Sequence, residues 1–372
     1  MGIQIAVYFL FIAFFLVYYK KDNKQNWKKF IIICSLILLL KAALRSLSIG
    51  SDTSHYAYYF YESINTPWSE LLSDFSTRYS KVGGELDAGY YLVQKVFSTF
   101  IHDFNLYTFV MQGLFFYWPL GTLIYRNSNS VLQVLFAYTL MNALFMGLPM
   151  ANARQVYAIG MCIWAFIYLT EKRYVRTVMF IMFGFLFHAS ALLFALPVVL
   201  SLLGSKTIKI ISVVAFFLSF VVLTSANTVI SFMGNMMEME RYAAYGEGEE
   251  QGGAITYIFL SLLLCLFCAF GFGKLKNVPY YSKNWFIMIP LTTFFVPLIY
   301  SSGSMIRITM YFQIFFILLV PMTIDILFKN NSRIQIYVTF ICILIVMSIY
   351  TSGEYIFFWQ EDQNPLKYWG RG

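Results

Sequence analysis

Five polar side chains that could take part in chemistry lie beside long apolar stretches of this sequence. They are Asp52, Asn152, Arg154, His188 and Arg307. An arginine guanidinium binds phosphate or carboxylate oxygens through paired hydrogen bonds, and a histidine or an aspartate can accept a proton from a hydroxyl group. If the fold brings these side chains together, they could hold an anion while a nearby hydroxyl loses its proton.

The two arginines occupy similar positions at the starts of predicted helices. Arg154 lies between Asn152 and Gln155, directly after a Gly- and Pro-containing segment. An arginine at this end of a helix opposes the helix dipole, so we expect an anion to compensate its charge. Arg307 repeats the arrangement, with Tyr311 one turn further along. Because the pattern occurs twice, it indicates an anion-binding role for both arginines.

Asp52 and His188 are candidates for proton transfer, and each has a structural alternative. Asp52 lies at a predicted helix start, where a carboxylate can cap backbone N–H groups without any further role. Tyr56 and the tyrosines after it suit stacking against sugar rings, but also the aromatic belt of a membrane protein. His188 lies in an apolar stretch and could be a buried core residue. Its position at a predicted turn also suits a general base.

Two further arginines could bind the same ligand. Arg45 lies near the end of a predicted membrane helix, where a charged group faces the bundle interior, binds a ligand or extends to the membrane interface. The sequence leaves the ligand and the interface open as alternatives. Arg241 lies in residues 231–253, a segment rich in Met, Glu and Gly. We expect this segment to be mobile and able to close over a substrate.

Apolar stretches dominate the chain and predict a polytopic membrane protein. The composition is 59% hydrophobic and only 12% charged, and the apolar runs approach the length that spans about 30 Å of hydrocarbon. We predict an all-α helical bundle of about 12 transmembrane segments, which forms a single integral membrane domain over residues 1–372. The predicted spans are residues 3–19, 30–47, 104–125, 131–148, 154–170, 174–187, 189–203, 208–230, 254–273, 285–301, 306–328 and 333–352.

Charge sets the predicted orientation of these spans. With the N-terminus outside, the inner connections carry most of the 26 Lys and Arg residues, as the cytoplasmic bias of basic residues requires. Residues 174–203 fit either one long tilted helix or two short helices that turn at His188. We expect the short pair, because it keeps Lys206 and Lys209 inside. Both termini then lie outside.

Three predicted extramembrane segments share the outer face. Residues 48–103 form an outer loop with two surface helices, and in residues 90–104 apolar residues recur at helical spacing with Gln94, Lys95 and Ser98 between them. That periodicity predicts a helix lying in the headgroup plane. The mobile loop 231–253 and the C-terminal tail 353–372 complete the set.

Several functional classes are not supported by the sequence. The net charge of +8 is explained by predicted cytoplasmic loops that suit anionic lipids, so we expect membrane lipids rather than nucleic acid as partners. All five cysteines fall inside predicted spans without a neighbouring His or acid, so we expect no metal and no disulfide. There is no nucleotide-binding glycine loop. We therefore expect neither a metal nor another cofactor.

The order of these motifs resembles that of a known family. The chain resembles the EpsG-like, Wzy-type polymerases of O-antigen and exopolysaccharide over nearly its whole length. The resemblance is carried by Arg45, Gly50-Ser51-Asp52-Thr53, Tyr56, Asn152-Ala153-Arg154-Gln155, Phe187-His188-Ala189-Ser190-Ala191-Leu192-Leu193, Arg307 and Tyr311, and by a tail at Asn364-Pro365-Leu366-Lys367. Asp87 stands where we expected a Glu.

The resemblance implies a function, a fold class and a location. It implies a bacterial enzyme of the cytoplasmic (inner) membrane that joins polyprenyl-diphosphate-linked oligosaccharide repeat units at the outer face. The product would be O-antigen, capsule or exopolysaccharide. Such enzymes are grouped with the metal-independent, GT-C-like glycosyltransferases. Whether a partner protein regulates the chain length is left open.

The residues fit that chemistry in a specific way. We expect Arg154 and Arg307 to bind the leaving diphosphate, with Arg45 or Arg241 assisting. Asn152, Gln155, Tyr56 and Tyr311 would contribute to substrate binding beside them. His188, or else Asp52, would accept the proton of the attacking hydroxyl, and Asp52 could instead orient sugar hydroxyls.

Two other functions remain as alternatives. A flippase for the same lipid-linked unit should show pseudo-symmetric halves and broken helices at the bilayer midplane, and no internal repeat is visible. A membrane acyltransferase that modifies the polysaccharide would need a His paired with an acid, and His188 has no acid near it in sequence.

Overall fold

The computed structural model describes residues 1–20, 22–73, 88–225, 228, 255–274, 283–300 and 305–368. Over these residues every regular element is a helix, and the only β pairing is an isolated bridge between Arg45 and Phe357. The predicted all-α class is confirmed. The chain divides into two compact units, one built from Met1–Ser80, Glu85–Leu192 and Ile334–Gly372, and the other mainly from Leu193–Arg333.

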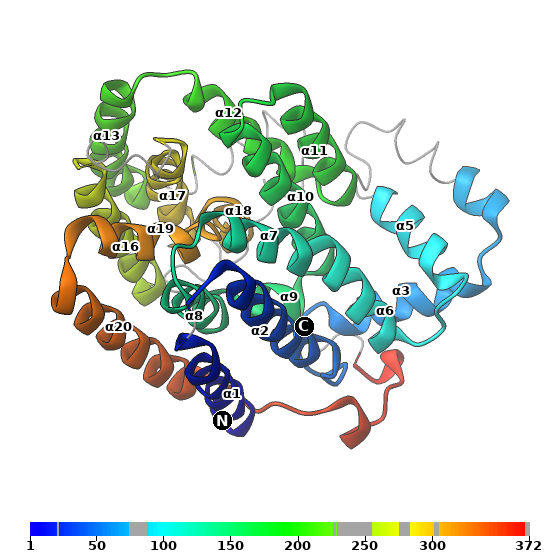
Figure 1. The fold of residues 1–372 in the computed structure, drawn as a ribbon. Helices are drawn as coiled ribbons and strands as arrows, with labels where there is room; N and C mark the ends of the chain where they lie inside the picture. The colour runs from blue at the N-terminus through cyan, green and yellow to red at the C-terminus, as the bar shows by residue number, and fades with distance from the viewer. Residues whose placement is uncertain are drawn as a thin grey trace. The chain divides into compact units, whose positions relative to one another are not determined.

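The first unit is built around helix α10. In chain order its helices are α1 (Gly2–Tyr19), α2 (Lys24–Ala43), α3 (Thr53–Asn65), α5 (Ala88–Ser98), α6 (Phe104–Gln112), the π-helical η1 (Gly113–Tyr117), α7 (Trp118–Asn127), α8 (Val131–Leu140), the π-helical η2 (Met141–Phe145), α9 (Gly147–Ala151), α10 (Ala153–Thr170), α11 (Tyr174–Phe187) and α20 (Asn330–Thr351) (Figure 1). Helix α10 packs along α11 and against η1 and α7, and α1, α2 and α8 pack together. Most of the side chains of α10 are consequently buried.

Close approach of α10 to η1 depends on one glycine. A Cβ atom at Gly160 would lie 1.6 Å from the backbone oxygen of Phe115, so no side chain fits at this crossing. Small residues permit such close helix packing in membrane proteins, where the hydrophobic effect does not drive helices together. Gly160 therefore sets the position of α10, and with it the position of the candidate residues at the N-terminal end of that helix.

The predicted break between two short helices at His188 is confirmed. Helix α11 ends at Phe187, and His188 has an extended backbone (φ −160°, ψ 124°). The chain resumes as the 3-10 helix η3 (Ala189–Phe194) and then as α12 (Ala195–Ser201). Residues 174–203 are therefore a pair of short helices, and not one long tilted helix.

Helix α5 is amphipathic as predicted, but it is shorter, and its polar face points inward. It ends at Ser98 rather than Phe104, because Asp103 caps the next helix through a 2.7 Å hydrogen bond from Leu106 N. Gln94 and Lys95 are buried, whereas Val96 is exposed. The Lys95 ammonium donates to the backbone oxygens of Ser63 (2.7 Å) and Ile64 (3.3 Å) at the C-terminal end of α3, where the helix dipole favours a cation.

The second unit contains eight described helices. They are α12, α13 (Ser205–Thr224), α16 (Ile255–Phe272), η5 (Lys283–Ile287), α17 (Met288–Phe295), η6 (Val296–Tyr300), α18 (Ile306–Gln313) and α19 (Phe316–Leu327). Gln313 joins two of them, because its amide donates to Ser261 Oγ at 2.9 Å while its oxygen accepts from Tyr257 Oη at 2.5 Å. This buried polar contact holds α18, the helix that carries Arg307, against α16.

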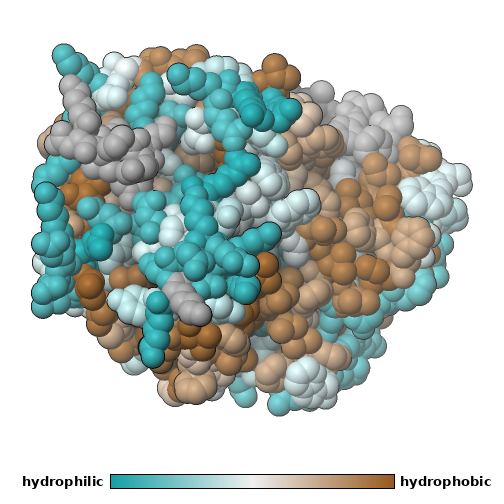
Figure 2. Space-filling view, viewed as in Figure 1, coloured by the Kyte–Doolittle hydropathy of each residue, from teal (hydrophilic) through white to brown (hydrophobic). Residues whose placement is uncertain are grey.

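Several helices suit a membrane environment. Among the described residues four are long and apolar enough to cross a membrane: α1, α13, α16 and α20. The bent pair α18 and α19 would make a fifth, with an angle of 46° between the two helices. Large apolar side chains are exposed along these helices, and Figure 2 shows broad hydrophobic areas on one face of the molecule. A lipid-facing surface accounts for them. The count of about 12 spans and the single domain stay predictions.

Candidate active site

The two motifs at residues 50–53 and 149–155 meet in the first unit. Thr53 Oγ1 lies 3.1 Å from the backbone oxygen of Met150 and 2.8 Å from that of Ile49. Gln112 of α6 contacts the second segment, because its buried amide donates a hydrogen bond to the backbone oxygen of Pro149 at 2.6 Å. Two segments about 100 residues apart in sequence thus meet: the turn before α3, and the end of α9 with its junction to α10. We call these two segments the loop pair.

Gly50 makes this contact possible. Its φ of +93° is in the region that favours glycine. A Cβ atom at this position would lie 2.2 Å from Met150 O. Residue 50 therefore has to be glycine for both its conformation and its contact with the second loop.

Arg45 lies inside this loop pair. Its guanidinium donates to the backbone oxygen of Ala42, to Ile49 O at 3.3 Å and to Thr53 Oγ1 at 3.3 Å. Only 4% of the residue is exposed, which contradicts the alternative in which Arg45 extends to the membrane interface. These contacts favour a positioning role, in which Arg45 holds residues 49–53 in place. Its assignment as a substrate ligand stays a prediction.

Arg154 lies at the start of α10, and its side chain packs over an aromatic ring of α3. Its guanidinium carbon is 5.7 Å from the ring centroid of Tyr56 in α3. The side chain is half-buried, and it occupies the first turn of α10, where backbone N–H groups lack partners within the helix. Packing on a ring and anion binding at the guanidinium edge are compatible in an arginine, so the geometry suits the predicted anion-binding role.

The other residues of these motifs are close by along the chain. Asn152 is the N-cap residue of α10, and Gln155 is buried in its first turn. Asp52 is half-buried at the N-cap position of α3, as predicted, but its side chain makes no cap hydrogen bond. Helix capping therefore does not explain why a carboxylate stands at residue 52, and the sugar-orienting and base roles stay open for it.

A row of aromatic side chains connects Tyr56 with the end of α11. The Tyr90 ring lies 5.8 Å from the Tyr56 ring and 6.0 Å from the Tyr157 ring, with which it stacks. Tyr157 in turn contacts Phe187 at 5.8 Å. The residue after Phe187 is His188, so Arg154 and His188 lie at the two ends of one aromatic cluster. The sequence does not mark Tyr90 or Tyr157 as site residues, because each is one of 28 tyrosines.

His188 is half-buried, and its ring forms a short polar contact. Nδ1 lies 2.6 Å from Ser190 Oγ. A hydrogen bond at Nδ1 orients the ring and determines whether Nε2 carries a proton. The extended backbone at residue 188 thus presents an oriented imidazole at the break between two helices, as a general base requires.

The C-terminal tail closes over the loop that follows α2. Backbone hydrogen bonds run from Ser46 N to Ile356 O (2.8 Å) and from Phe358 N to Leu44 O (3.0 Å). Glu361 accepts hydrogen bonds from Ser46 Oγ at 2.7 Å and Ser48 Oγ at 2.6 Å. The tail thereby holds residues 44–48, directly before Gly50. Glu361 was not predicted, and no sequence signal marks its partners.

We expect docking of the tail to weaken in acid. Hydrogen bonds from Ser48 and then Ser46 lower the pKa of the Glu361 carboxyl. A lowered pKa stabilises the docked tail above the ordinary pKa of Glu, and this stabilisation is lost as the pH falls through the lowered value. Limited proteolysis of residues 353–368 between pH 7 and pH 3 should show faster cleavage in acid.

Two variants test the origin of that pH dependence. Glu361→Gln should release the tail at every pH and flatten the profile, whereas Asp362→Asn, at the adjacent exposed acid, should leave the profile unchanged. Equal profiles for the two variants would show that Glu361 does not hold the tail.

The remaining predicted residues lie in other parts of the chain. In the second unit, Arg307 is half-buried in the first turn of α18, and Tyr311 is 0% exposed on the same helix. The complete burial of Tyr311 favours packing over substrate contact. Arg241 and Asp87, with the loop 231–253, lie outside the described residues. That Arg154 and Arg307 hold one diphosphate stays a prediction from sequence.

Comparison with known proteins gives one result for the chain. A protein-family model described as the EpsG family matches residues 28–361, so the match includes every predicted site residue. No curated protein and no solved structure gives a significant match.

Proposed function

Because the chain belongs to the EpsG family, we propose that it polymerises polyprenyl-diphosphate-linked oligosaccharide units into a polysaccharide at the outer face of the cytoplasmic membrane. The observation that carries this proposal is the meeting of residues 50–53 and 149–155, which sets Arg154 against Tyr56 at the start of α10. A site with an arginine, a helix N-terminus and tyrosines suits a ligand that is both a diphosphate and a sugar.

The reaction is a glycosyl transfer. A hydroxyl oxygen of the acceptor sugar forms a bond to the anomeric carbon of the donor. The bond from that carbon to the diphosphate oxygen breaks, and the diphosphate leaves with the electron pair. The acceptor hydroxyl loses its proton to a base. Negative charge therefore develops on phosphate oxygens while the sugar carbon becomes cation-like, and groups that bind the developing anion lower the barrier.

Arg154 is the residue we assign to the leaving diphosphate. Arg154 lies in the first turn of α10, and a guanidinium fork and the first N–H groups of a helix both favour an anion. A guanidinium that already packs on a ring, as that of Arg154 does on Tyr56, should lose less side-chain entropy when the ligand binds.

His188 is the residue we assign as the general base. The Ser190 hydroxyl contacts its Nδ1, and Nε2 is the atom that we assign to the acceptor hydroxyl. His188→Gln should lower turnover by about 10² to 10⁴, the range for loss of a general base, while the protein stays in the membrane. Turnover is measured by incorporation of labelled lipid-linked units into polymer.

Two variants serve as controls for His188. His102→Gln, at an exposed histidine, should keep full turnover. If His188→Gln is active and Asp52→Asn is not, then Asp52 is the base and the assignment of His188 is wrong.

The proposed function is tested with purified protein and its lipid-linked repeat unit. A polymerase gives a ladder of products, separated by one repeat unit, without an energy source. In cells, deletion of a polymerase leaves single units on the outer side of the membrane, whereas deletion of a flippase leaves them inside. Absence of a ladder together with internal accumulation would assign the chain as a flippase.

The burial of Ser190 argues against the acyltransferase alternative. The Ser190–His188 contact resembles a nucleophile and its base. Only 1% of Ser190 is exposed, however, so an acyl donor could not reach its hydroxyl. This burial supports the polymerase over an acyltransferase.

A further inference from the structure

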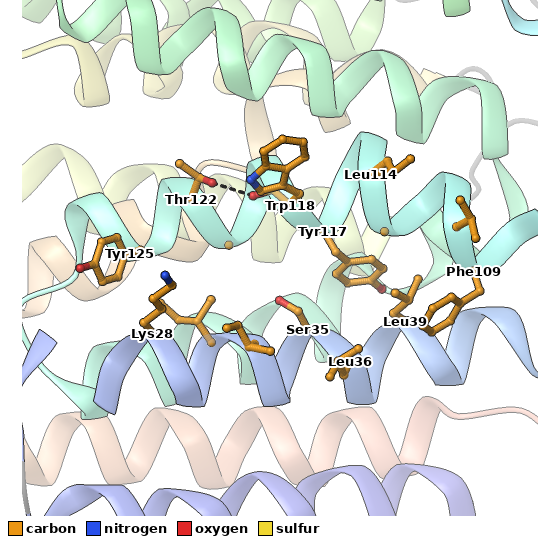
Figure 3. Close-up of a pocket in the computed structure, with 15 residues that line it drawn as sticks. Lys28, Ser35, Leu36, Leu39, Phe109, Leu114, Tyr117, Trp118, Thr122 and Tyr125 are labelled. Atoms are coloured by element: carbon orange, nitrogen blue, oxygen red, sulfur yellow. Dashed lines mark hydrogen bonds between the residues drawn. The ribbon is translucent and has the colours of Figure 1, made fainter. Parts of the chain in front are cut away.

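The first unit contains a groove that the proposed reaction does not use. A cavity of about 700 Å³ lies between α2 and the continuous segment α6–η1–α7 (Figure 3). Its volume is in the range of ligand pockets, which is about 300 to 1,000 Å³. Helix α2 contributes Ile31, Leu36 and Leu39 to its walls, and the facing segment contributes Val110, Leu114 and Trp118.

The groove is apolar and opens sideways. Leu36 is 43% exposed and Trp118 is 62% exposed, although both side chains line the cavity. Leu36 and Trp118 belong to the spans that the sequence predicts at residues 30–47 and 104–125, and in those spans the opening would face the hydrocarbon of the bilayer. An extended hydrocarbon chain is the kind of ligand that fits such a surface, because it offers no hydrogen bonds and gains from burial.

One end of the groove is positively charged. Lys28 lines this end, and in Figure 3 its ammonium points toward Tyr125 across the groove. Lys24 lies one turn earlier on α2, with its ammonium 5.8 Å from the Tyr125 ring centroid. No carboxylate belongs to the described residues that line the groove. Two lysines at the mouth of an apolar groove suit a phosphate that is joined to a hydrocarbon chain.

The spacing of these groups suits a membrane if α2 crosses it, as the sequence predicts. A helix of 20 residues, as α2 is, spans about 30 Å, and Lys28 lies in its second turn. The groove then runs about 16 Å along α2 from Lys28 to Leu39, at about 1.5 Å per residue. A headgroup at Lys28 would lie at the membrane surface, and its chain would extend toward the bilayer centre.

We propose that this groove is a binding site for an anionic phospholipid, with its phosphate on Lys28 and Lys24 and one acyl chain between α2 and η1–α7. The bound lipid stabilises the first unit by joining α2 to the facing segment. This lipid site is separate from the candidate active site. The lipid-binding proposal and the polymerase proposal are therefore independent of each other.

The headgroup contact is tested by thermal unfolding of the full-length protein in detergent. Phosphatidylglycerol should raise the midpoint temperature more than phosphatidylcholine with the same acyl chains. Lys28→Gln should weaken phosphatidylglycerol binding about fivefold, which corresponds to ~1 kcal/mol for one lysine at an anionic surface. Lys29→Gln is the matched control, because Lys29 is the next residue, is also exposed and does not line the groove.

The contact with the lipid acyl chain is tested with two variants that each introduce a larger side chain. Leu36→Trp should fill the groove and reduce the phosphatidylglycerol retained by the protein, as measured by native mass spectrometry. Leu40→Trp should not, because Leu40 has the same exposed fraction of 43% but lies outside the groove. Both positions are exposed, so neither variant should prevent folding.

Three results would overturn the proposal. Equal stabilisation by the two lipids would show a non-specific hydrocarbon surface. Equal losses in the Lys28 and Lys29 variants would show only general attraction to anionic lipid. Displacement of phosphatidylglycerol by a lower concentration of polyprenyl phosphate would show that the groove takes a polyprenyl chain instead.

Discussion

Replacement of Arg154 by alanine should lower polymer formation by about 10² to 10³, which is the usual loss when one preorganised donor to a developing oxyanion is removed. The lost interaction is made mainly in the transition state, so turnover should fall more than apparent substrate affinity. Arg154→Lys should also lose activity, because an ammonium cannot reproduce the paired hydrogen bonds of the guanidinium or its stacking on Tyr56.

The chain offers a matched control for Arg154. Arg176 also lies in the first turn of a helix, α11, and its guanidinium carbon is 5.5 Å from the ring centroid of Tyr168. Its position at the start of α11 is predicted to face the cytoplasm, away from the lipid-linked donor. Arg176→Ala should therefore keep polymer formation. Normal product ladders from Arg154→Ala would rule out the assigned role.

Replacement of Gly50 by alanine should separate the two loops of the candidate site. The backbone of residue 50 has a φ of +93°, which costs a non-glycine residue about 1 to 3 kcal/mol. The added Cβ would also lie 2.2 Å from Met150 O, and overpacking of this kind costs about 1 to 3 kcal/mol. The loops must then move apart, and displacement of a positioned group by about 1 Å can reduce activity about 10²-fold.

Gly147→Ala is the control for this variant. Gly147 is three residues before Met150, and a Cβ atom there meets nothing within 4 Å. Thermal unfolding and polymer formation should both change in Gly50→Ala and stay near wild type in Gly147→Ala. If Gly50→Ala unfolds at the wild-type temperature with full activity, then contact between the two loops does not support the site.

The fold class could be predicted because it depends on local properties of the chain. Apolar runs of membrane length and the bias of basic residues indicate a helical membrane protein wherever the helices pack. The helix break at His188 was also predictable, because a single long helix would have placed the following lysines on the wrong side of the membrane.

The burial of the polar face of α5 could not be predicted from the sequence. Helical periodicity predicts that Val96 lies on one face and Gln94 and Lys95 on another, but it does not say which face meets the protein. The structure buries Lys95 because the carbonyl groups at the end of α3 accept its hydrogen bonds. That partner is about 30 residues away and carries no sequence signal.

The sequence by itself determined that this protein is a helical membrane protein. It also identified the arginines, His188 and Asp52 as residues that could bind or act on an anionic sugar substrate. Only the tertiary structure decided that residues 50–53 and 149–155 meet, that the Arg45 guanidinium contacts the first of these segments and that the tail contacts the residues before it through Glu361. The physical reason is that composition and periodicity act within a few turns of a helix. Contacts between residues a hundred or three hundred positions apart depend instead on how the helices pack.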